Sequence, residues 1–506
     1  MADVESEGVT THIERPRNAA IPDATIYSTA WRLPFITPWR LPGLLLALLR
    51  RMGSQDHLVT TFDTTIKPEN PESVVWRLDA VTQPKAATFD FDVAIVGLGY
   101  VGLPTALAFH NSGSRVLALD VSPKRLSVIK AQDADLLDND RTRLRNALGD
   151  DAFELSIDPS MLSRAAAIIV CVPTPVDDHL IPDLSILRSA CAMVVEQAVP
   201  GQLAMLTSTS YVGCTTDMLV EPLAARGFDV GRDIYVAFSA ERINPGVDDV
   251  AHDDVPRVIG GATPECEEAA VVLLSRYAAS VYRVHSLATA EMTKLLENTF
   301  RAVNIALANE FSDICRALDI PVTEVISAAA TKPYGFMPFL PGPGVGGHCI
   351  PCDPHYLLWQ LRKQRVAAPM ITQAMVEIAA RPTRVVDRVR EILANSGIGL
   401  GGARVLVVGV SYKPDVADLR ESPALEILAG LYDSGAIVGF VDPHFDTLTL
   451  SNGVVLDGMT DPAVFDADLV LLHTRHAGSD LSWVSADQLV LDATYRNVDL
   501  PQRVLL

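Results

Sequence analysis

The stretch "VAIVGLGYVGLP", residues 93–104, constrains the fold of this chain more than any other. An apolar run ends at Gly97, and Gly99 and Gly102 complete a G-x-G-x-x-G spacing before a helix-like segment. The first two glycines permit a tight turn and a close approach to a pyrophosphate, and the third lets the helix pack on the strand. The pattern predicts a dinucleotide-binding turn, with cofactor contacts from Gly97, Gly99, Tyr100, Val101 and Gly102.

A carboxylate about twenty residues further on indicates which dinucleotide, NAD or NADP, the turn prefers. The next strand-like run, "RVLALD", ends in Asp120. A carboxylate at this place accepts hydrogen bonds from the ribose hydroxyls and repels a 2′-phosphate, so NAD is favoured over NADP. Lys124 and Arg125 follow closely and soften this preference.

The rest of the chain continues as alternating strands and helices, which predicts parallel, doubly wound sheets. Residues 289–318 contain neither Gly nor Pro and predict one helix of about 45 Å, and a second strand–helix block opens at 403. The predicted fold is α/β, with two Rossmann-like doubly wound domains joined by a long central helix and a helical middle domain. The predicted parts are a poorly ordered extension (1–88), an NAD-binding domain (89–285), a central helical domain (286–400) and a C-terminal Rossmann-like domain (401–506).

Charge and cysteine content limit the partners and the compartment. The formal net charge is −21, which argues against nucleic acid or an anionic membrane as the main partner but leaves anionic small molecules open. Seven cysteines, an odd number, do not read as a disulfide framework and favour a reducing cytoplasm. No apolar run reaches the roughly 18–20 residues of a membrane-spanning helix. The basic, Leu-rich stretch 39–51 reads either as a membrane-surface contact or as a solvated or packed segment.

The loop "PGVGGHCIPCDPHYL", residues 343–357, allows three interpretations. A structural zinc site needs four ligands, and "CIPC" has no second cysteine pair in the chain, so no metal is predicted. A thioredoxin-type pair normally follows the first strand of a small domain, whereas this pair lies late in a long chain. The favoured interpretation is a single nucleophilic thiol, Cys349, that captures an aldehyde so that a second oxidation gives a thioester. Lys294 and Asn298 lie four apart on one helix face, and Asp353 lies four residues after the thiol.

Seven ordered landmarks make the chain resemble the UDP-glucose/GDP-mannose dehydrogenase family over about residues 91–500. They are "GLGYVGLPTA", "VPTPVD", "STSYVGCTTD", "SAERINPG", "KLLENTFRAVNIALANE", "PGPGVGGHCIPCDPHYL" and "GVSYKPDVADLRESP". The resemblance implies a dimer or larger homo-oligomer built on the long helix, and an enzyme that oxidises the primary alcohol of a UDP-sugar twice with NAD. Bacterial surface polysaccharide synthesis is the implied setting.

The resemblance also implies residue roles. Cys349 would be the nucleophile, and Lys294 and Asn298 would stabilise the oxyanion. Asp353 and Thr209 would hold the hydrolytic water, and Glu241 would relay protons. Thr174 and Thr209 would join the cofactor contacts. The implied substrate contacts are Glu241, Arg242, Lys294, Asn298, Gly346, Gly347, Lys413 and Arg420.

The "GGHCIP" loop resembles the branch that acts on UDP-N-acetylhexosamines, and "TKPYGFMPF" favours UDP-GlcNAc. UDP-ManNAc, UDP-glucose and GDP-mannose remain as alternatives. So do a one-step alcohol dehydrogenase in which Cys349 is structural, and an inactive scaffold that keeps the fold. Three residues depart from the family pattern: Ala240 replaces a usual Pro, Thr207 a usual acidic residue and Cys352 a usual aliphatic. Cys352 is either a small apolar replacement or a thiol able to form a disulfide with Cys349.

Overall fold

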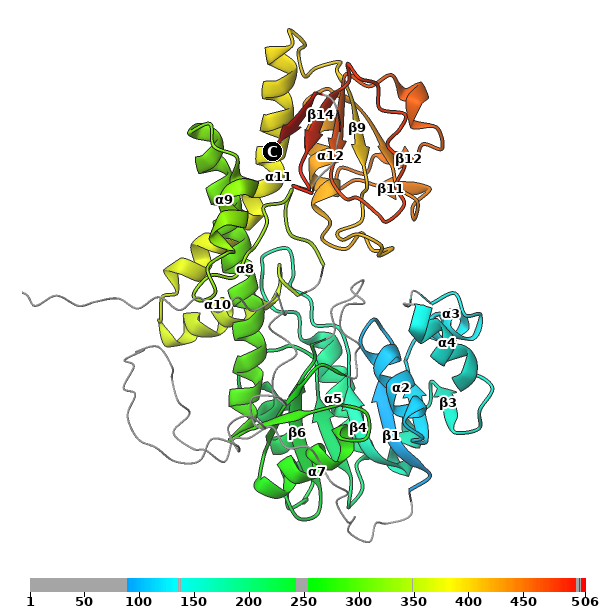
Figure 1. Ribbon diagram of the computed structural model, residues 1–506. Coiled ribbons are helices and arrows are strands. Elements are labelled where there is room, and N and C mark those ends of the chain that lie inside the picture. Colours follow the sequence, from blue (N-terminus) through cyan, green and yellow to red (C-terminus); the bar gives the residue numbers. More distant parts are fainter. Residues whose placement is uncertain are drawn as a thin grey trace, which may run out of the picture. The chain divides into compact units, whose positions relative to one another are not determined.

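The computed structural model describes residues 89–134, 136, 138–242, 254–347, 349–496, 500 and 502–506 (Figure 1). The extension 1–88, with its basic stretch 39–51, lies outside the described residues, as does His348.

An eight-stranded sheet forms the first block, in the order β3-β2-β1-β4-β5-β6-β7-β8. Strand β1 is buried along almost its whole length because apolar clusters lie on both faces of the sheet. The strands are β1 (Phe91–Val96), β2 (Val116–Leu119), β3 (Phe153–Ser156), β4 (Ala165–Val170), β5 (Leu203–Leu206), β6 (Tyr235–Ala240), β7 (Arg257–Gly261) and β8 (Val281–Val284).

Helices cover both faces of this sheet, as the alternating sequence predicted (Figure 1). They are α2 (Gly102–Asn111), α3 (Pro123–Lys130), α4 (Asp138–Ala147), α5 (Ser185–Gln197), α6 (Glu221–Ala225) and α7 (Pro264–Leu274). Short helical turns η1 (Pro159–Arg164) and η2 (Thr216–Val220) complete the block. The order reverses between β1 and β4, the place where ligands bind in doubly wound sheets.

One strand pairing corrects the prediction of a parallel sheet. Strand β7 runs antiparallel to β6, with Ala240 opposite Val258. An antiparallel neighbour needs no crossover helix, and the alternation of apolar runs in a sequence does not reveal strand direction.

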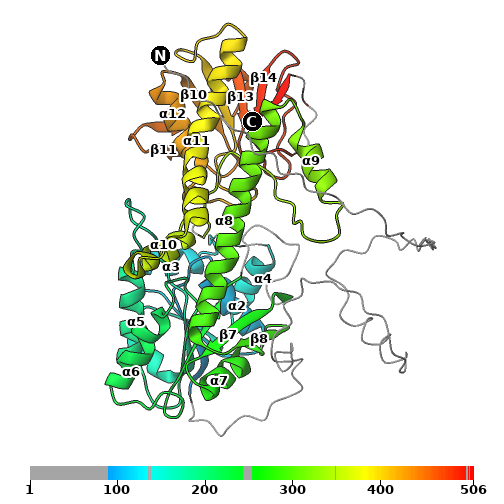
Figure 2. The same cartoon turned by 90° about the vertical axis from the view of Figure 1, so that its left-hand side faces the viewer.

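The long helix is confirmed as α8 (Leu287–Ala317), which begins with Ser286 capping the Thr289 amide. It packs on β6 and β7 at its start and runs beside α11 (Pro369–Asn395), as Figure 2 shows. Near its end the Ser312 hydroxyl bonds Tyr495 of the C-terminal block. Two shorter helices, α9 (Val322–Ala329) and α10 (Asp353–Gln364), complete this helical part.

The second strand–helix block is also confirmed. Its parallel sheet has the order β10-β9-β13-β14-β15 and reverses between β9 and β13. The elements are β9 (Arg404–Val408), α12 (Pro423–Asp433), β10 (Ile437–Val441), η4 (Pro462–Phe465), β13 (Leu469–Leu472), β14 (Leu489–Asp492) and β15 (Arg503–Leu505), with a small hairpin of β11 (Thr447–Thr449) and β12 (Val455–Asp457). Within the described residues, the helices are too short or too polar to cross a membrane.

Candidate active site

The turn after β1 has the form that the three glycines predicted. Gly97 has φ +91°, a conformation that favours glycine. A Cβ on Gly102 would lie 1.8 Å from the Gly97 carbonyl oxygen, so the third glycine is required for α2 to approach the strand. A Cβ on Gly99 would meet nothing within 4 Å. The space beside Gly99 is therefore open, and a pyrophosphate there could approach the backbone amides of the turn.

Asp120 borders this turn at the end of β2. Its carboxylate accepts hydrogen bonds from the Leu98 amide at 2.8 Å and from the Ser122 amide at 2.9 Å. Arg125 donates through Nε to the Leu98 carbonyl at 2.7 Å. Arg125 is thus engaged with the turn itself, and the fixed carboxylate suits ribose hydroxyls. These residues fit a bound NAD.

Helix α8 and the start of α10 bring together the residues predicted around the thiol. The Asn298 amide donates to the Asp353 carboxylate, and the Asp353 amide donates to the Cys349 carbonyl at 2.9 Å. The Thr209 hydroxyl hydrogen-bonds the same carboxylate, and the charge of Lys294 acts on both Cys349 and Asp353. Residues 209, 294, 298, 349 and 353, far apart in sequence, therefore converge on one place.

Asp353 has the protonation behaviour of a general base. Burial raises its pKa to about 6, although the nearby Lys294 charge and hydrogen bonds from Asn298 and Thr209 oppose this shift. The carboxylate is therefore ionised at neutral pH yet close to its own pKa, where proton transfer in both directions is efficient.

Cys349 is exposed, but protein groups displace much of the water around its thiol. This desolvation raises the pKa of Cys349, the Asp353 charge raises it further, and Lys294, Arg301 and Arg420 lower it. The thiol is thus protonated at rest and needs a base in order to attack. Cys352 is buried, and burial raises its pKa to about 12, which fits the small apolar interpretation.

The loop that carries Thr209 is fixed by two helices. The buried Glu291 carboxylate of α8 accepts from the Gly213 amide at 2.6 Å and from the Thr215 amide and hydroxyl at 2.8 and 2.7 Å. Gln360 of α10 exchanges two hydrogen bonds with the backbone of Val212. Thr207 bonds the Val170 carbonyl and the Cys171 sulfur, which gives this family departure a structural explanation.

Glu241 lies at the end of β6 and contacts three charged neighbours. Its carboxylate pairs with Arg257 at 2.7 Å, and its carbonyl oxygen accepts from Lys294 Nζ at 2.5 Å. The adjacent Arg242 pairs with Glu297. Arg257 was not predicted; the one signal for it was an arginine at the start of the otherwise apolar run "RVIGG".

The two glycines before the thiol have a packing role. A Cβ on Gly346 would lie 2.5 Å from the Glu421 carbonyl, and one on Gly347 would lie 2.8 Å from the Tyr412 ring. The Gly347 amide also donates to the Arg420 carbonyl at 3.1 Å. These contacts fasten the thiol loop to the segment between β9 and α12. Contact of these glycines with substrate stays a prediction, as does any cofactor contact of Thr174, which lies beside the Tyr356 hydroxyl of α10.

The segment between β9 and α12 places its two predicted cations differently. Arg420 forms hydrogen bonds to Asp418 at 2.7 to 3.0 Å, and its guanidinium lies 4.6 Å from the centre of the Tyr100 ring. Arg420 thus reaches the turn after β1. Burial lowers the pKa of Lys413 to about 8, and the charges of Arg301 and Arg496 lower it as well.

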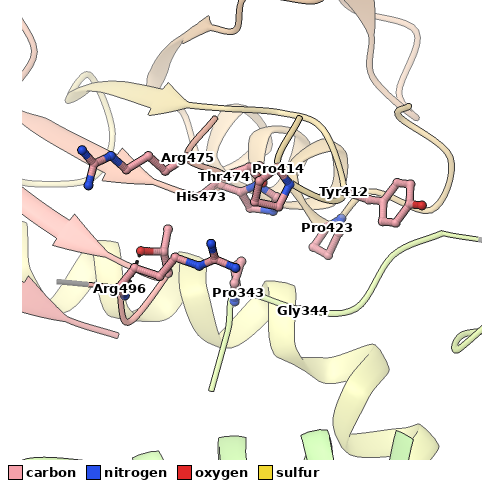
Figure 3. Close-up of a pocket in the computed structure, with 10 residues that line it drawn as sticks. Pro343, Gly344, Tyr412, Pro414, Pro423, His473, Thr474, Arg475 and Arg496 are labelled. Carbon is pink, nitrogen blue, oxygen red and sulfur yellow. Dashed lines mark hydrogen bonds between the residues drawn. The ribbon is translucent and has the colours of Figure 1, made fainter. Parts of the chain in front are cut away.

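A cavity of about 140 Å³ opens beside this segment, at the carboxyl ends of β9 and β13 (Figure 3). It lies where the second sheet reverses its order, the usual ligand position in such folds. Arg475 and Arg496, which the sequence did not reveal as site residues, line it together with Tyr412 and His473. His473 is buried, its Nε2 has no hydrogen-bond partner within the described residues, and burial lowers its pKa to about 4.

The described residues contain no group of three His, Cys, Asp or Glu side chains placed to hold a metal. Absence of a metal stays a prediction, because His348 lies outside the described residues.

Three family models match the chain in order. The UDP-glucose/GDP-mannose dehydrogenase family's NAD binding domain matches residues 91–280, its central domain 288–378 and its UDP binding domain 406–498. The first match confirms the prediction of NAD.

Named relatives resemble the chain over most of their length. It is 34% identical over 407 residues to the NDP-N-acetyl-D-galactosaminuronic acid dehydrogenase of Ralstonia nicotianae, covering 78% of this chain and 92% of that one. It is 33% identical over 421 residues to the UDP-N-acetyl-D-mannosamine dehydrogenase of Escherichia coli, covering 79% and 98%.

The solved structure of the UDP-D-ManNAc dehydrogenase from Pyrococcus horikoshii has a TM-score of 0.74 and 29% identity, covering 82% of this chain and 98% of that one. The native structure of the UDP-N-acetyl-mannosamine dehydrogenase from Staphylococcus aureus has a TM-score of 0.69 and 30% identity, covering 82% and 97%. These similarities extend over the cofactor turn, the thiol site and the second sheet alike, and the chain therefore belongs to the UDP-glucose/GDP-mannose dehydrogenase family, as an NAD-dependent nucleotide-sugar dehydrogenase.

Proposed function

We propose that this enzyme oxidises the C6 alcohol of a UDP-N-acetylhexosamine to the carboxylate, through a covalent intermediate on Cys349. The observation that supports this most is the convergence of Lys294, Asn298 and Asp353 on the Cys349 loop. An enzyme that stopped at the aldehyde would need an oxyanion stabiliser but neither a nucleophile nor a base for hydrolysis.

The chain's own groups account for each part of the sequence of steps. Bound NAD would accept one hydride in each of the two oxidations. The Cys349 thiol adds to the aldehyde carbon and passes its proton through Asp353 to the solvent, which forms a thiohemiacetal anion and leaves Asp353 as a carboxylate; loss of the second hydride turns this anion into a thioester. Lys294 and Asn298 stabilise negative charge on the former carbonyl oxygen. Asp353, positioned by Thr209 and Asn298, then takes a proton from the attacking water, and the thiol leaves as the acid forms.

The cofactor and the nucleotide are proposed to bind at the two places where a sheet reverses its order. The start of α2 and Asp120 would hold NAD. Lys413, together with Arg475 and Arg496, would hold the UDP diphosphate. Arg475 and Arg496 line the cavity, and Lys413 follows the lining residue Tyr412 and is close enough to Arg496 for their charges to interact. Arg420 would contact both ligands from its position over Tyr100.

The test is the NADH yield per sugar with purified protein. We expect two NADH per sugar and an acid product from the wild type. Cys349→Ala should lose the acid, whereas the matched Cys352→Ala should keep both yield and rate, since Cys352 is buried and acts as an apolar residue. Asp353→Asn should also lose most of the acid, because the thiol proton and the water proton both lose their acceptor; sugar that does react should remain as acyl-enzyme, visible by intact-protein mass. One NADH per sugar with aldehyde released, unchanged in Cys349→Ala, would contradict the thioester route.

The choice of epimer needs its own comparison. The sequence favours UDP-GlcNAc, while the names of the relatives give UDP-N-acetyl-D-mannosamine and an NDP-N-acetyl-D-galactosaminuronic acid product as competing indications. UDP-GlcNAc, UDP-ManNAc, UDP-GalNAc, UDP-glucose and GDP-mannose would be offered in parallel. Turnover on one acetamido sugar supports the proposal, and turnover only on the last two would contradict it.

We also propose that two copies associate through α8. Its outward side carries exposed large apolar residues at helical spacing along most of its length. They are Met292, Leu296, Phe300, Leu307, Phe311 and Ile314. Tyr334, Phe336 and Met337, which follow α9 in the sequence, are also exposed. Light scattering should give a dimer or larger species, lost in Leu296→Glu/Phe311→Glu but kept in the control Val464→Glu; a monomeric wild type would contradict the proposal.

Two further features are proposals of the same kind. The division into 89–285, 286–400 and 401–506 is supported by β8 ending at Val284 and by α11 ending at Asn395. A cytoplasmic location is supported by the seven cysteines, all free in the structure, since reducing compartments keep thiols reduced.

A further inference from the structure

Arg257, at the start of β7, is as buried as an apolar core residue, with 1% of its surface exposed. Its guanidinium pairs with the Glu241 carboxylate, Nη1 to Oε1, at 2.7 Å and lies 5.5 Å from the centre of the Tyr277 ring. A buried ion pair adds little net stability because both charges lose their water. This pair therefore calls for another explanation.

The antiparallel register of β6 and β7 produces this contact. Ala240 stands opposite Val258, so the next pair outward is Glu241 and Arg257. Arg242 strengthens the same junction by donating through Nη1 to the Pro256 carbonyl at 3.0 Å. Two cross-strand contacts thus fix the backbone just where β6 ends.

Glu241 connects this junction to the thiol site. Its Oε1 also accepts from the Arg242 amide at 2.7 Å, so two donors restrict the carboxylate. Its carbonyl oxygen accepts from Lys294 Nζ at 2.5 Å. The three N–H donors of a lysine ammonium rotate together about the Cε–Nζ bond, so binding one of them to a fixed carbonyl orients the other two. The Lys294 charge in turn acts on both Cys349 and Asp353.

Within the described residues, charged groups face Glu241 from β7, from α8 and from the end of β6. Arg257 faces it from β7, Lys294 from α8, and the Arg242–Glu297 pair flanks it between β6 and α8. On the β4 side, burial raises the pKa of Cys171 to about 12, and the charge of Glu241 adds to this while that of Arg257 opposes it. A carboxylate paired with a buried guanidinium is stabilised in its charged form.

We propose that Arg257 is a positioning residue for the oxidation: it keeps Glu241 ionised and immobile, so that the Glu241 carbonyl aims Lys294 at the reacting oxygen and proton transfer is left to Asp353. The inference rests on the proposed function. It also changes the predicted role of Glu241 from a proton relay to a fixed electrostatic support.

The test compares Arg257→Met and Arg257→Lys with a matched control, Arg276→Met. Arg276 is an arginine of the same block that pairs with Asp92 at 2.9 Å, on strand β1 rather than at the thiol site. For Arg257→Met we expect kcat to fall about 100-fold with the KM for NAD changed less than about 3-fold, because oxyanion stabilisation is lost while the cofactor turn is intact. The acidic side of the kcat–pH profile of Arg257→Met should move to higher pH, because Glu241 has then lost its pairing with Arg257 and takes up a proton. Arg257→Lys should restore most of kcat and return the acidic side of the kcat–pH profile to its wild-type position.

Glu241→Gln supplies an independent arm that keeps the shape of the site. For Glu241→Gln we expect a reduced kcat, with the acidic side of its kcat–pH profile still at the pH that Asp353 sets. We expect the double variant Glu241→Gln/Arg257→Met to be no slower than the slower of the two single variants. Loss of the acidic side of the profile in Glu241→Gln would make Glu241 the proton carrier and overturn the proposal. The proposal would also be overturned if the kcat and pH profile of Arg257→Met matched those of the control Arg276→Met. The same holds if the losses of kcat in the two single variants multiply in the double variant.

Failure of the proposed function would appear elsewhere. The wild-type enzyme would then yield one NADH per sugar whatever residue stands at 257. A wild type that yields two NADH, with Arg257 variants like the control, would instead overturn only the positioning role.

Discussion

The turn after β1 and the turn after β9 share one backbone geometry. Gly97 has φ +91° and Gly409 has φ +79°. In each turn the amide of the next residue donates to an aspartate at the end of the neighbouring strand, Asp120 at 2.8 Å and Asp442 at 2.7 Å. The two sheets thus carry the same turn, each after a central strand that pairs with parallel neighbours.

The two turns differ in the segment that leads from each of them into its helix. Helix α2 begins at Gly102, directly after the first turn, so an anion there meets backbone amides. Helix α12 begins only at Pro423, after a segment that supplies Lys413 and Arg420. In the proposed binding mode, the first turn holds its anion with backbone amides, which do not titrate, and the second holds its anion with side chains, of which Lys413 titrates. We therefore expect the connection after the shared turn, rather than the turn itself, to determine which ligand binds.

The largest expected effect comes from adding one methyl group to each turn. A Cβ on Gly102 would lie 1.8 Å from the Gly97 oxygen, and a Cβ on Gly409 would lie 1.7 Å from the Thr474 oxygen. Gly102→Ala should weaken NADH binding about 100-fold or more and leave UDP binding intact, because only the first turn is displaced. Gly409→Ala should do the reverse. Calorimetric titration of both ligands checks this, and loss of both ligands in either variant would show that the turns are not independent.

A pH titration should separate the two turns next. Burial lowers the pKa of Lys413 to about 8, so its charge is present below that pH and is lost above it. The KM for the UDP-sugar should rise above pH 8, by up to about tenfold for each pH unit while the Lys413 charge is being lost. The KM for NAD should stay level, and Lys413→Arg should flatten the rise for the sugar. If the KM for NAD rose with pH as steeply as the KM for the UDP-sugar, the proposed difference between the two turns would be contradicted.

Sequence reasoning predicted the first turn better than the second because its signals are local. Three glycines and Asp120 lie within one strand–helix–strand unit, whose geometry follows from spacing alone. Arg475 and Arg496 follow β13 and β14, and they meet at the cavity only because of the order of the second sheet. No spacing rule brings them together.

The thiol site shows the same limit. Cys349, Asn298 and Asp353 were predicted by chemistry and resemblance, and the structure does bring them together. Arg257 was missed because its contact with Glu241 depends on an antiparallel register that the alternating pattern does not reveal. The packing contacts of Gly346 and Gly347 were likewise unpredictable, since they depend on Tyr412 from another block.

The two aspartates at these turns should differ in what their loss affects, which is mainly stability for Asp442 and mainly NAD binding for Asp120. Burial alone would raise the pKa of Asp442, but hydrogen bonds from His476 and from the Val410 and His444 amides bring it to about 2. Its contribution of about 2 kcal/mol is present above pH ~4 and is lost as pH falls through about 2. Asp442→Asn should lower stability by a similar amount at pH 7, measured by urea unfolding, with the KM for NAD unchanged.

Asp120→Asn is the matched variant for this test. It should raise the KM for NAD about tenfold with a smaller loss of stability, because its carboxylate is proposed to bind the ribose as well as the turn. An Asp442→Asn enzyme as stable as the wild type would mean that the second turn does not depend on its carboxylate.

The smallest expected effect concerns Lys124 and Arg125, which were expected to soften the preference for NAD. Lys124 is exposed, whereas Arg125 is held by the Leu98 carbonyl at 2.7 Å. Lys124→Ala should change the ratio of kcat/KM for NADP and NAD by no more than about 3-fold, because an exposed ammonium is screened by water and salt. Arg125→Ala should weaken both cofactors equally, since it loosens the turn itself. A tenfold loss of kcat/KM for NADP in Lys124→Ala would instead mean that side-chain charge determines ligand choice at the first turn too. The contrast with the Lys413 segment would then disappear.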